Sequence, residues 1–133
     1  MHELIVPGTA WQAMRRRVQR CEPLEACGLL AGKDGQVEVV IGVLNAARSP
    51  VRYLMEPGAQ WRALNKIEQL GLDLLGIYHS HPNGPQRPSP TDIQEACYAV
   101  VQIIWFPKDG KWRAGGFWIE AGQVSDVTLQ LLK

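Results

Sequence analysis

The chain reads HSHPNGPQRPSPTD from His79 to Asp92, and this stretch governs the interpretation of the whole sequence. A strand-like run, Leu72 to Tyr78, precedes it, so His79 and His81 are expected to project from one face of a strand. Asp92 follows His81 after ten intervening residues, across a turn rich in Gly and Pro that can fold back. Two imidazoles and one carboxylate are a ligand set for a catalytic metal with its fourth position open to water. The stretch therefore predicts a metal site at the end of a strand.

The same stretch also has a purely structural interpretation. Ser89-Pro90-Thr91-Asp92 has the form of a helix capping box, with Ser89 at N-cap, Pro90 at N1 and Asp92 at N3. If Ser89 to Asp92 were the only feature, helix capping would be the favoured interpretation. The paired histidines favour the metal site instead, because a cap that fixes the helix start would also aim the Asp92 carboxylate at the preceding strand. The two interpretations are partly compatible, although we expect a metal-bound Asp92 not to close the reciprocal half of the box fully. Ser80 points to the other face of the strand and is interpreted as structural.

The composition is that of one soluble globular domain. At 133 residues, with 46% hydrophobic and 20% charged residues, the chain can bury a core and is neither disordered nor fibrous. We expect a single domain over residues 1–133. The net charge of +1 and the absence of a basic stripe do not indicate a nucleic-acid-binding surface. The cationic run Arg15 to Arg17 lies in a helix-like segment, where a solvated helix face is favoured over a partner or phosphate contact.

The cysteines favour a reducing compartment. There are three of them, without paired spacing, which argues against a disulfide framework. Cys27 and Cys97 lie in apolar surroundings and are predicted to be small core residues. A nucleophilic cysteine partnered by His79 or His81 would leave the paired histidines without a role. The N-terminus shows no signal-peptide pattern and no apolar run reaches the length of a membrane span, so we expect a cytoplasmic location.

Hydrophobic periodicity and turn residues predict a mixture of helices and strands. Helices are expected over about 10–20 with Thr9 as cap, from Pro57 to Gly71, and briefly from Ser89. Strands are expected over 26–32 and 37–44 as one hairpin, over 72–81, and over 99–106 and 112–120 as another, before a last strand or helix reaching Leu132. This pattern predicts an α/β or α+β fold built on a mixed sheet.

Hydrolysis at a metal needs a proton carrier in addition to the ligands. A metal with an open position lowers the pKa of its water toward ~7 and polarises a carbonyl, but the proton of that water must still be moved. Glu25 is a candidate because it lies just before a buried strand. Spacing alone cannot choose it over Glu56 or Glu95; Glu56 is better explained as a helix-start charge and Glu95 as a solvated helix position.

Three segments together resemble the JAMM/MPN-plus family of zinc metallopeptidases. They are Pro23 to Gly32, His79 to Pro82, and Pro88 to Asp92. The family motif is an early glutamate, then His-x-His, ten residues and Asp, and this sequence matches every position. The similarity runs from about Leu4 to beyond Trp118. It implies a mixed sheet between helices, resembling the cytidine deaminase architecture.

The resemblance implies a role for each motif residue. His79, His81 and Asp92 would hold one zinc ion, with water as the fourth ligand. Glu25 corresponds to the glutamate that holds this water and carries its proton to the leaving amine. Ser89 matches the serine whose side chain stabilises the tetrahedral oxyanion. These roles agree with the chemistry of acyl-transfer hydrolysis, in which oxyanion stabilisation is usually the largest contribution.

The resemblance also implies a class of substrate. At 133 residues the chain has little room for the insertions with which eukaryotic relatives grip ubiquitin. It is similar to compact prokaryotic peptidases that act on ubiquitin-like sulfur-carrier proteins and hydrolyse the amide after the C-terminal diglycine. Its loop Pro82 to Arg87 departs from that of the cysteine-releasing relatives, so the cargo stays open. Arg48 and Tyr53 are predicted groove contacts; Trp61 is a further candidate, for which core packing on a helix stripe is favoured.

Other classes of function are also consistent with parts of the sequence. A non-catalytic MPN-type scaffold would be expected to have broken ligands, and here all are intact. A DNA-repair-associated member of the same fold is disfavoured by the near-neutral charge. A zinc deaminase would show Cys-x-x-Cys ligands, and none occur. The expected partner is the C-terminal tail of a carrier protein, with no nucleic acid or membrane, and the chain is expected to be a monomer or homodimer.

Overall fold

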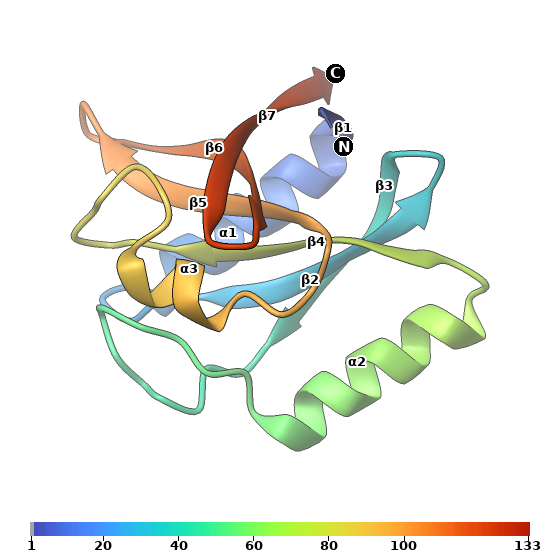
Figure 1. The fold of residues 1–133 in the computed structure, drawn as a ribbon, viewed down its shortest axis with the longest axis horizontal. Coiled ribbons are helices and arrows are strands. Elements are labelled where there is room, and N and C mark those ends of the chain that lie inside the picture. Colours follow the sequence, from blue (N-terminus) through green and yellow to red (C-terminus); the bar gives the residue numbers. More distant parts are fainter. Residues whose placement is uncertain (1) are drawn as a thin grey trace.

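Residues 2–133 of this computed structural model form seven strands and three helices (Figure 1). The strands are β1 (Glu3–Pro7), β2 (Cys27–Lys33), β3 (Gln36–Val43), β4 (Asp73–Ser80), β5 (Val101–Lys108), β6 (Lys111–Glu120) and β7 (Gln123–Leu132). The helices are α1 (Gly8–Cys21), α2 (Pro57–Gln69) and α3 (Pro90–Glu95). No helix within residues 2–133 has the length and apolar character needed to cross a membrane.

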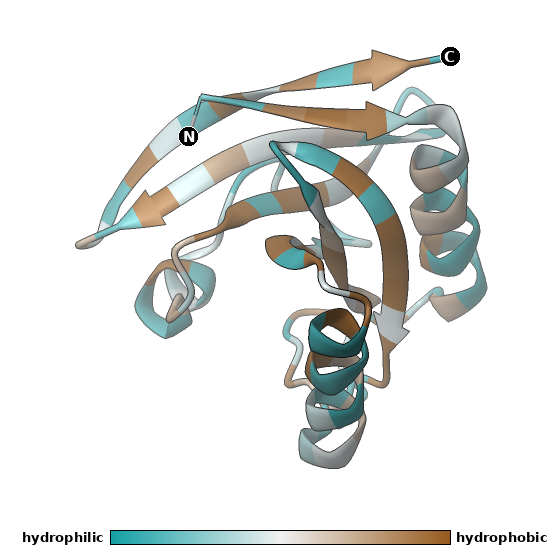
Figure 2. Cartoon of the chain, turned by 90° about the vertical axis from the view of Figure 1, so that its right-hand side faces the viewer, coloured by the Kyte–Doolittle hydropathy of each residue, from teal (hydrophilic) through white to brown (hydrophobic). Residues whose placement is uncertain are grey.

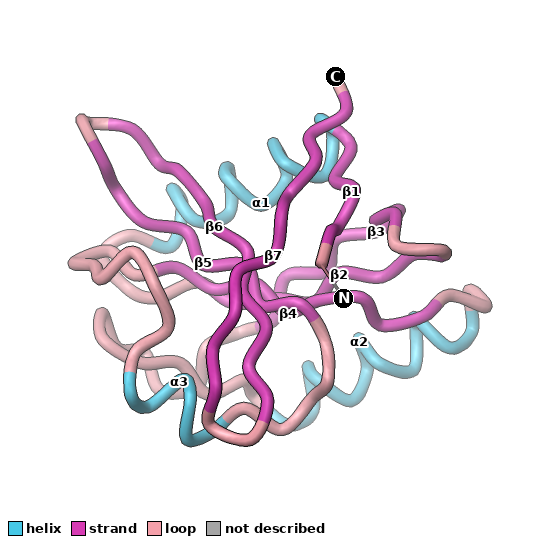
Figure 3. The backbone as a smooth tube through the Cα atoms, turned by 45° about the horizontal axis from the view of Figure 1, so that its top comes forward, coloured by secondary structure: helices cyan, strands magenta, loops and turns pink. Residues whose placement is uncertain are grey.

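The strands form one mixed sheet that closes on itself. Its order is β3-β2-β4-β5-β6-β7-β1, and a single pair, Ile5 with Gln36, joins β1 back to β3. The neighbours β4 and β5 run parallel, as do β1 and β7, whereas β2 is antiparallel to both β3 and β4. The Asp34-Gly35 and Asp109-Gly110 turns join the two predicted hairpins, with positive φ at all four residues. Figure 3 shows β1 beside β7, with β3 on the other side of β1.

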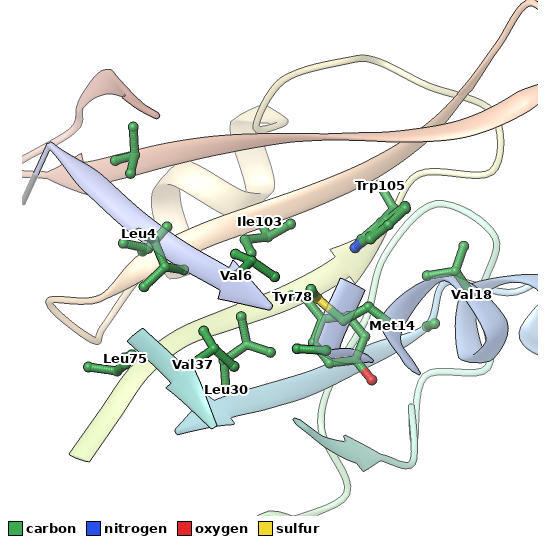
Figure 4. Close-up of a cluster of buried hydrophobic side chains, with 14 residues drawn as sticks. Leu4, Val6, Met14, Val18, Leu30, Val37, Leu75, Tyr78, Ile103 and Trp105 are labelled. Carbon is green, nitrogen blue, oxygen red and sulfur yellow. The ribbon is translucent and has the colours of Figure 1, made fainter. Parts of the chain in front are cut away.

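Alternation along the strands builds a core on each face of the sheet. On one face α1 contributes Met14 and Val18, which pack with Leu30 and Trp105 among the side chains of Figure 4. On the other face α2 contributes Ala63 and Ile67, which pack with residues such as Leu29 and Ile77. Leu29 and Leu30 are neighbours on β2 and pack into different cores, because successive side chains of a strand point to opposite faces of the sheet. Figure 2 shows that the helices carry both hydrophobic residues, in brown, and hydrophilic residues, in teal, as expected for helices with one buried side. The expected α+β fold with a mixed sheet and covering helices is confirmed.

Several local expectations are wrong or incomplete. The first helix begins at Gly8 after Pro7, with no side-chain cap, so Thr9 is not the N-cap. Strand β1 precedes this helix and was not predicted; its Leu4 and Val6 are fully buried in the core. The last element, expected to be either a strand or a helix, is a strand of ten residues.

Three side chains are placed differently from their predicted environments. Trp61 is 66% exposed, so core packing is wrong for it; Ala63 and Ile67 take the buried stripe of α2 instead. Cys97 is exposed rather than in the core, whereas Cys27 is buried as expected. Arg17 is not on a solvated face, because its guanidinium reaches across to the Val43 carbonyl and its Nε is buried.

Candidate metal centre

The two histidines at the end of β4 point to one face of the sheet, and Ser80 between them points to the other. His79 and His81 are 1% and 2% exposed and share the face that α2 covers. Ser80 points the other way and accepts a hydrogen bond on Oγ from the backbone N–H of Ala26 at 2.8 Å. The structural interpretation of Ser80 is therefore confirmed. This bond also ties the end of β4 to the start of β2 and fixes the direction of both imidazoles.

Helix α3 brings Asp92 against the histidines through its N-terminal cap. Ser89 Oγ accepts the N–H of Asp92 at 3.1 Å, and Asp92 Oδ2 accepts the N–H of Ser89 at 2.9 Å. The same Oδ2 lies 3.2 Å from His79 Nε2 and 3.0 Å from His81 Nε2. Both halves of the box are thus closed while Asp92 faces the histidines, and the expectation for a metal-bound Asp92 stays a prediction. One carboxylate oxygen completes the cap and faces both imidazoles.

The three donor atoms fit a divalent metal. His79 Nε2 and His81 Nε2 are 3.0 Å apart, so with Asp92 Oδ2 they form a triangle with edges of 3.0 to 3.2 Å. Ligands bound tetrahedrally at about 2.0–2.1 Å lie about 3.3 Å from one another. His81 Nδ1 donates to the Pro85 carbonyl at 2.8 Å, which leaves a lone pair on Nε2 in the neutral ring. Three donor atoms this close repel one another when each presents a lone pair to the same point, and a cation between them relieves that repulsion, so this donor set fits a divalent metal.

Strand register places Glu25 at the same centre. Cys27 pairs with His79 in the antiparallel β2–β4 ladder, so Glu25, two residues earlier, comes level with His81. A Glu25 carboxylate oxygen and one nitrogen of each histidine lie within 4.8 Å of one another. Glu25 is 3% exposed and its Oε1 is buried without a hydrogen-bond partner. The structure thus selects Glu25, because Glu56 caps α2 by accepting the Ala59 N–H and Glu95 is exposed.

Burial and mutual contacts perturb the protonation of all four groups in the metal-free site. Burial raises the pKa of Glu25 to about 8, although His81 opposes this. Burial also lowers the pKa of His79. At His81 burial acts in the same direction, but the Asp92 carboxylate outweighs it and the pKa is raised. Burial would raise the pKa of Asp92, yet hydrogen bonds from both imidazoles hold it well below its usual range. Such perturbed groups gathered in one place are typical of a reactive centre.

A cleft of about 230 Å³ opens beside the candidate metal ligands. It lies between the loop around Tyr53 and the chain that leads from α3 into β5, and Asp92 is part of its wall. Tyr53 stacks on His79, with 4.6 Å between ring centroids. Gln102, which is 6% exposed, and Cys97 also line the cleft. Sequence reasoning missed both, since only the β4–β5 register places Gln102 next to Ile77. Arg48 is exposed and lies outside the cleft lining.

Comparison with known proteins identifies the family. Residues 7–123 match the family described as prokaryotic homologs of the JAB domain. The chain belongs to this family. Its fold also matches the solution structure of a protein from Desulfitobacterium hafniense, with a TM-score of 0.88, 29% identity, and coverage of 98% of this chain and 93% of the other.

Curated relatives of this prokaryotic JAB protein are named as peptidases. A probable TtuB-protein conjugate cleaving protease of Thermus thermophilus is 45% identical over 80% of this chain and 72% of its own length. A CysO-cysteine peptidase of Mycobacterium tuberculosis is 36% identical over 76% of this chain and 74% of its own length. These names confirm the predicted JAMM/MPN-type family and the predicted hydrolase class.

Proposed function

We propose that this prokaryotic JAB protein is a zinc peptidase that hydrolyses the amide bond after the C-terminal diglycine of a ubiquitin-like carrier protein. The observation that carries the proposal is the triangle of His79, His81 and Asp92 donor atoms, with the buried Glu25 carboxyl beside it. The names of the relatives support the substrate class, because they refer to a protein conjugate and to a carrier–cysteine adduct. We propose a monomer or homodimer in the cytoplasm, where its free cysteines would stay reduced.

Each polar residue would have a separate task. Zinc, held by the two histidines and Asp92, would acidify a bound water and polarise the scissile carbonyl. Glu25 would take the proton of the attacking water and deliver it to the leaving amine, with no covalent intermediate. The buried Glu25 carboxyl lies close to both histidines and its Oε1 has no hydrogen-bond partner, so it is placed to receive that proton. Ser89 accepts the Asp92 N–H with its oxygen, so its own O–H is free to donate to the oxyanion.

The cleft supports an extended, narrow substrate. The Tyr53 ring covers His79, and Met55, Ile77 and Tyr98 give the cleft apolar walls. A tail without side chains next to the scissile bond could approach a centre this deeply buried, which fits a diglycine. We propose Tyr53 as a wall of the tail site and Arg48, exposed in the same loop, as a contact farther along the tail.

Replacement of Glu25 tests the proposal. Glu25→Gln should keep one zinc per chain, because Glu25 is not among the three proposed ligands, but should lower kcat by about 10²–10⁴-fold. The measurement is mass-spectrometric analysis of products from TtuB and CysO carrying one added residue after the diglycine, together with metal analysis. Glu38→Gln, the same change at an exposed strand position, should leave the rate unchanged. An unaltered rate in Glu25→Gln would remove Glu25 from the mechanism, and wild-type protein that binds no metal would favour a scaffold.

A further inference from the structure

A group of cations surrounds the turn between β5 and β6, and the peptidase chemistry gives it no role. Lys108, Lys111 and Arg113 are exposed on this hairpin, and Arg15 reaches the same place from α1. These four residues, called the hairpin cluster below, line a recess of about 360 Å³ together with Trp11, Phe106, Trp112 and Ala114. None of the four takes part in an ion pair among residues 2–133.

Three members of the hairpin cluster, Lys108, Lys111 and Arg113, alternate onto the metal-bearing face of the sheet, whereas Arg15 reaches the end of the hairpin from α1 on the opposite face. His79 pairs with Ile104 on β5, and Ile104 pairs with Gly115 on β6. Two residues further along, Phe106 on β5 pairs with Arg113 on β6. His81 lies level with this pair, because its N–H donates a hydrogen bond to the Trp105 carbonyl and so continues the β4–β5 register. Strands are about 4.8 Å apart, so Arg113 lies about 10 Å from His81 across the sheet.

The lysines continue the same face toward the end of the hairpin. Lys108 and Lys111 stand opposite each other two residues beyond Phe106 and Arg113, which adds about 7 Å. In Figure 1 the hairpin and the loop that follows β4 leave the sheet at the same end. A protein held by its tail at the metal would therefore lie within reach of the cluster.

The cluster is electrostatically unfavourable in the isolated chain. Like charges at directly opposed positions, as in Lys108 and Lys111, destabilise a strand pair. The nearest acidic groups do not cancel them in full. Asp109 occupies the turn itself, and the Glu22 carboxylate accepts a hydrogen bond from the Trp112 indole. An anionic surface placed on the hairpin would relieve this repulsion and would cover the aromatic rings beside it.

We propose that the hairpin cluster docks an acidic surface on the folded carrier whose tail enters the metal centre, a proposal that rests on the proposed function. The four charges come from two strands and a helix around one open recess, so a surface with several carboxylates can pair with more of them than a single small anion can. A ubiquitin-like domain of roughly 75 residues has a radius of gyration of about 11 Å, so it can contact the cluster while its tail lies some 8–12 Å away across the sheet. The cluster then selects carriers by charge, independently of the diglycine.

The test compares a folded substrate with its isolated tail. The substrates are TtuB with one added residue after its diglycine and a peptide of its last eight residues with the same addition. Lys108→Glu/Lys111→Glu should lower kcat/KM for the folded substrate by at least about tenfold at low salt and leave the peptide within about twofold. Rising NaCl should lower the wild-type rate on the folded substrate and affect the variant little. Arg62→Glu/Lys66→Glu, an equal change of charge on α2, should behave like wild type.

The outcomes separate the two proposals. Equal losses on both substrates, or no loss on either, overturn docking by the cluster while the peptidase function stands. If wild type with zinc cleaves neither substrate, the proposed function fails. A binding measurement then tests the docking proposal by itself. Fluorescence anisotropy measures the affinity of labelled TtuB for the Glu25→Gln protein with and without the two lysine substitutions. Weaker binding in the substituted protein supports it, and unchanged or absent binding refutes it.

Discussion

Glu25 shows how one buried side chain can favour activity at the expense of stability. Its folded-state pKa is about 8, well above the ordinary value of 4.5, because burial penalises the charged form. As pH rises from about 4.5 to about 8, the unfolded chain loses a proton that the folded metal-free chain retains. Stability of the metal-free protein therefore falls over this range, and the loss is complete above pH 8.

Glu25→Gln removes that titration and should make the metal-free protein relatively more stable at high pH. In chelator-treated samples the Tm of the variant minus that of wild type should be larger at pH 8.5 than at pH 5, by about 4 °C for each kcal/mol. Thermal denaturation followed by circular dichroism at both values measures this. Glu38→Gln controls for loss of an exposed charge. The same difference at the two pH values would show that the Glu25 pKa is ordinary.

Helix α3 is short and depends on its cap, so at the scale of elements Ser89 should affect both structure and metal binding. Ser89→Ala removes the acceptor for the Asp92 N–H and should cost about 1 kcal/mol of stability. Because the cap also orients Asp92, zinc affinity should fall, and loss of the free O–H should lower kcat by about 10²-fold. Ser89→Thr keeps both hydrogen-bonding abilities and should retain most activity. Calorimetric titration with zinc and steady-state kinetics measure the two effects, and full activity in Ser89→Ala would exclude the oxyanion role.

At the scale of the molecule, the metal should join parts of the fold that the chain separates. The proposed ligands come from the end of β4 and from α3, and Glu25 comes from the start of β2. A ligand that binds only the folded state stabilises it by about 2.7 kcal/mol at 100 times its dissociation constant. Removing zinc from such a sample with a chelator should therefore lower Tm by about 11 °C, and adding it back should restore the value. His81→Ala should show no such response; an equal response would place the metal elsewhere.

The sequence predicted the elements and ligands whose signals are local. The spacing of His79 and His81 on a strand, the capping box at Ser89, and the Asp-Gly turns of both hairpins are each encoded within a few residues. The mixed sheet followed from the same periodicities, and the helices on both of its faces from the family resemblance. The choice of Glu25, by contrast, came from the family resemblance, because spacing left it equivalent to Glu56 and Glu95.

Long-range pairing decided the rest. The bond from Ala26 N–H to Ser80 Oγ joins residues 54 apart in the chain, and this register is what carries Glu25 to the histidines. Pairing of β1 with both β7 and β3 closes the sheet and buries Leu4 and Val6, although a strand of five residues gives little signal of its own. The row from His81 to Arg113 likewise exists only across three paired strands. Local periodicity specifies which face a side chain takes, whereas register between distant strands determines which side chains meet on that face.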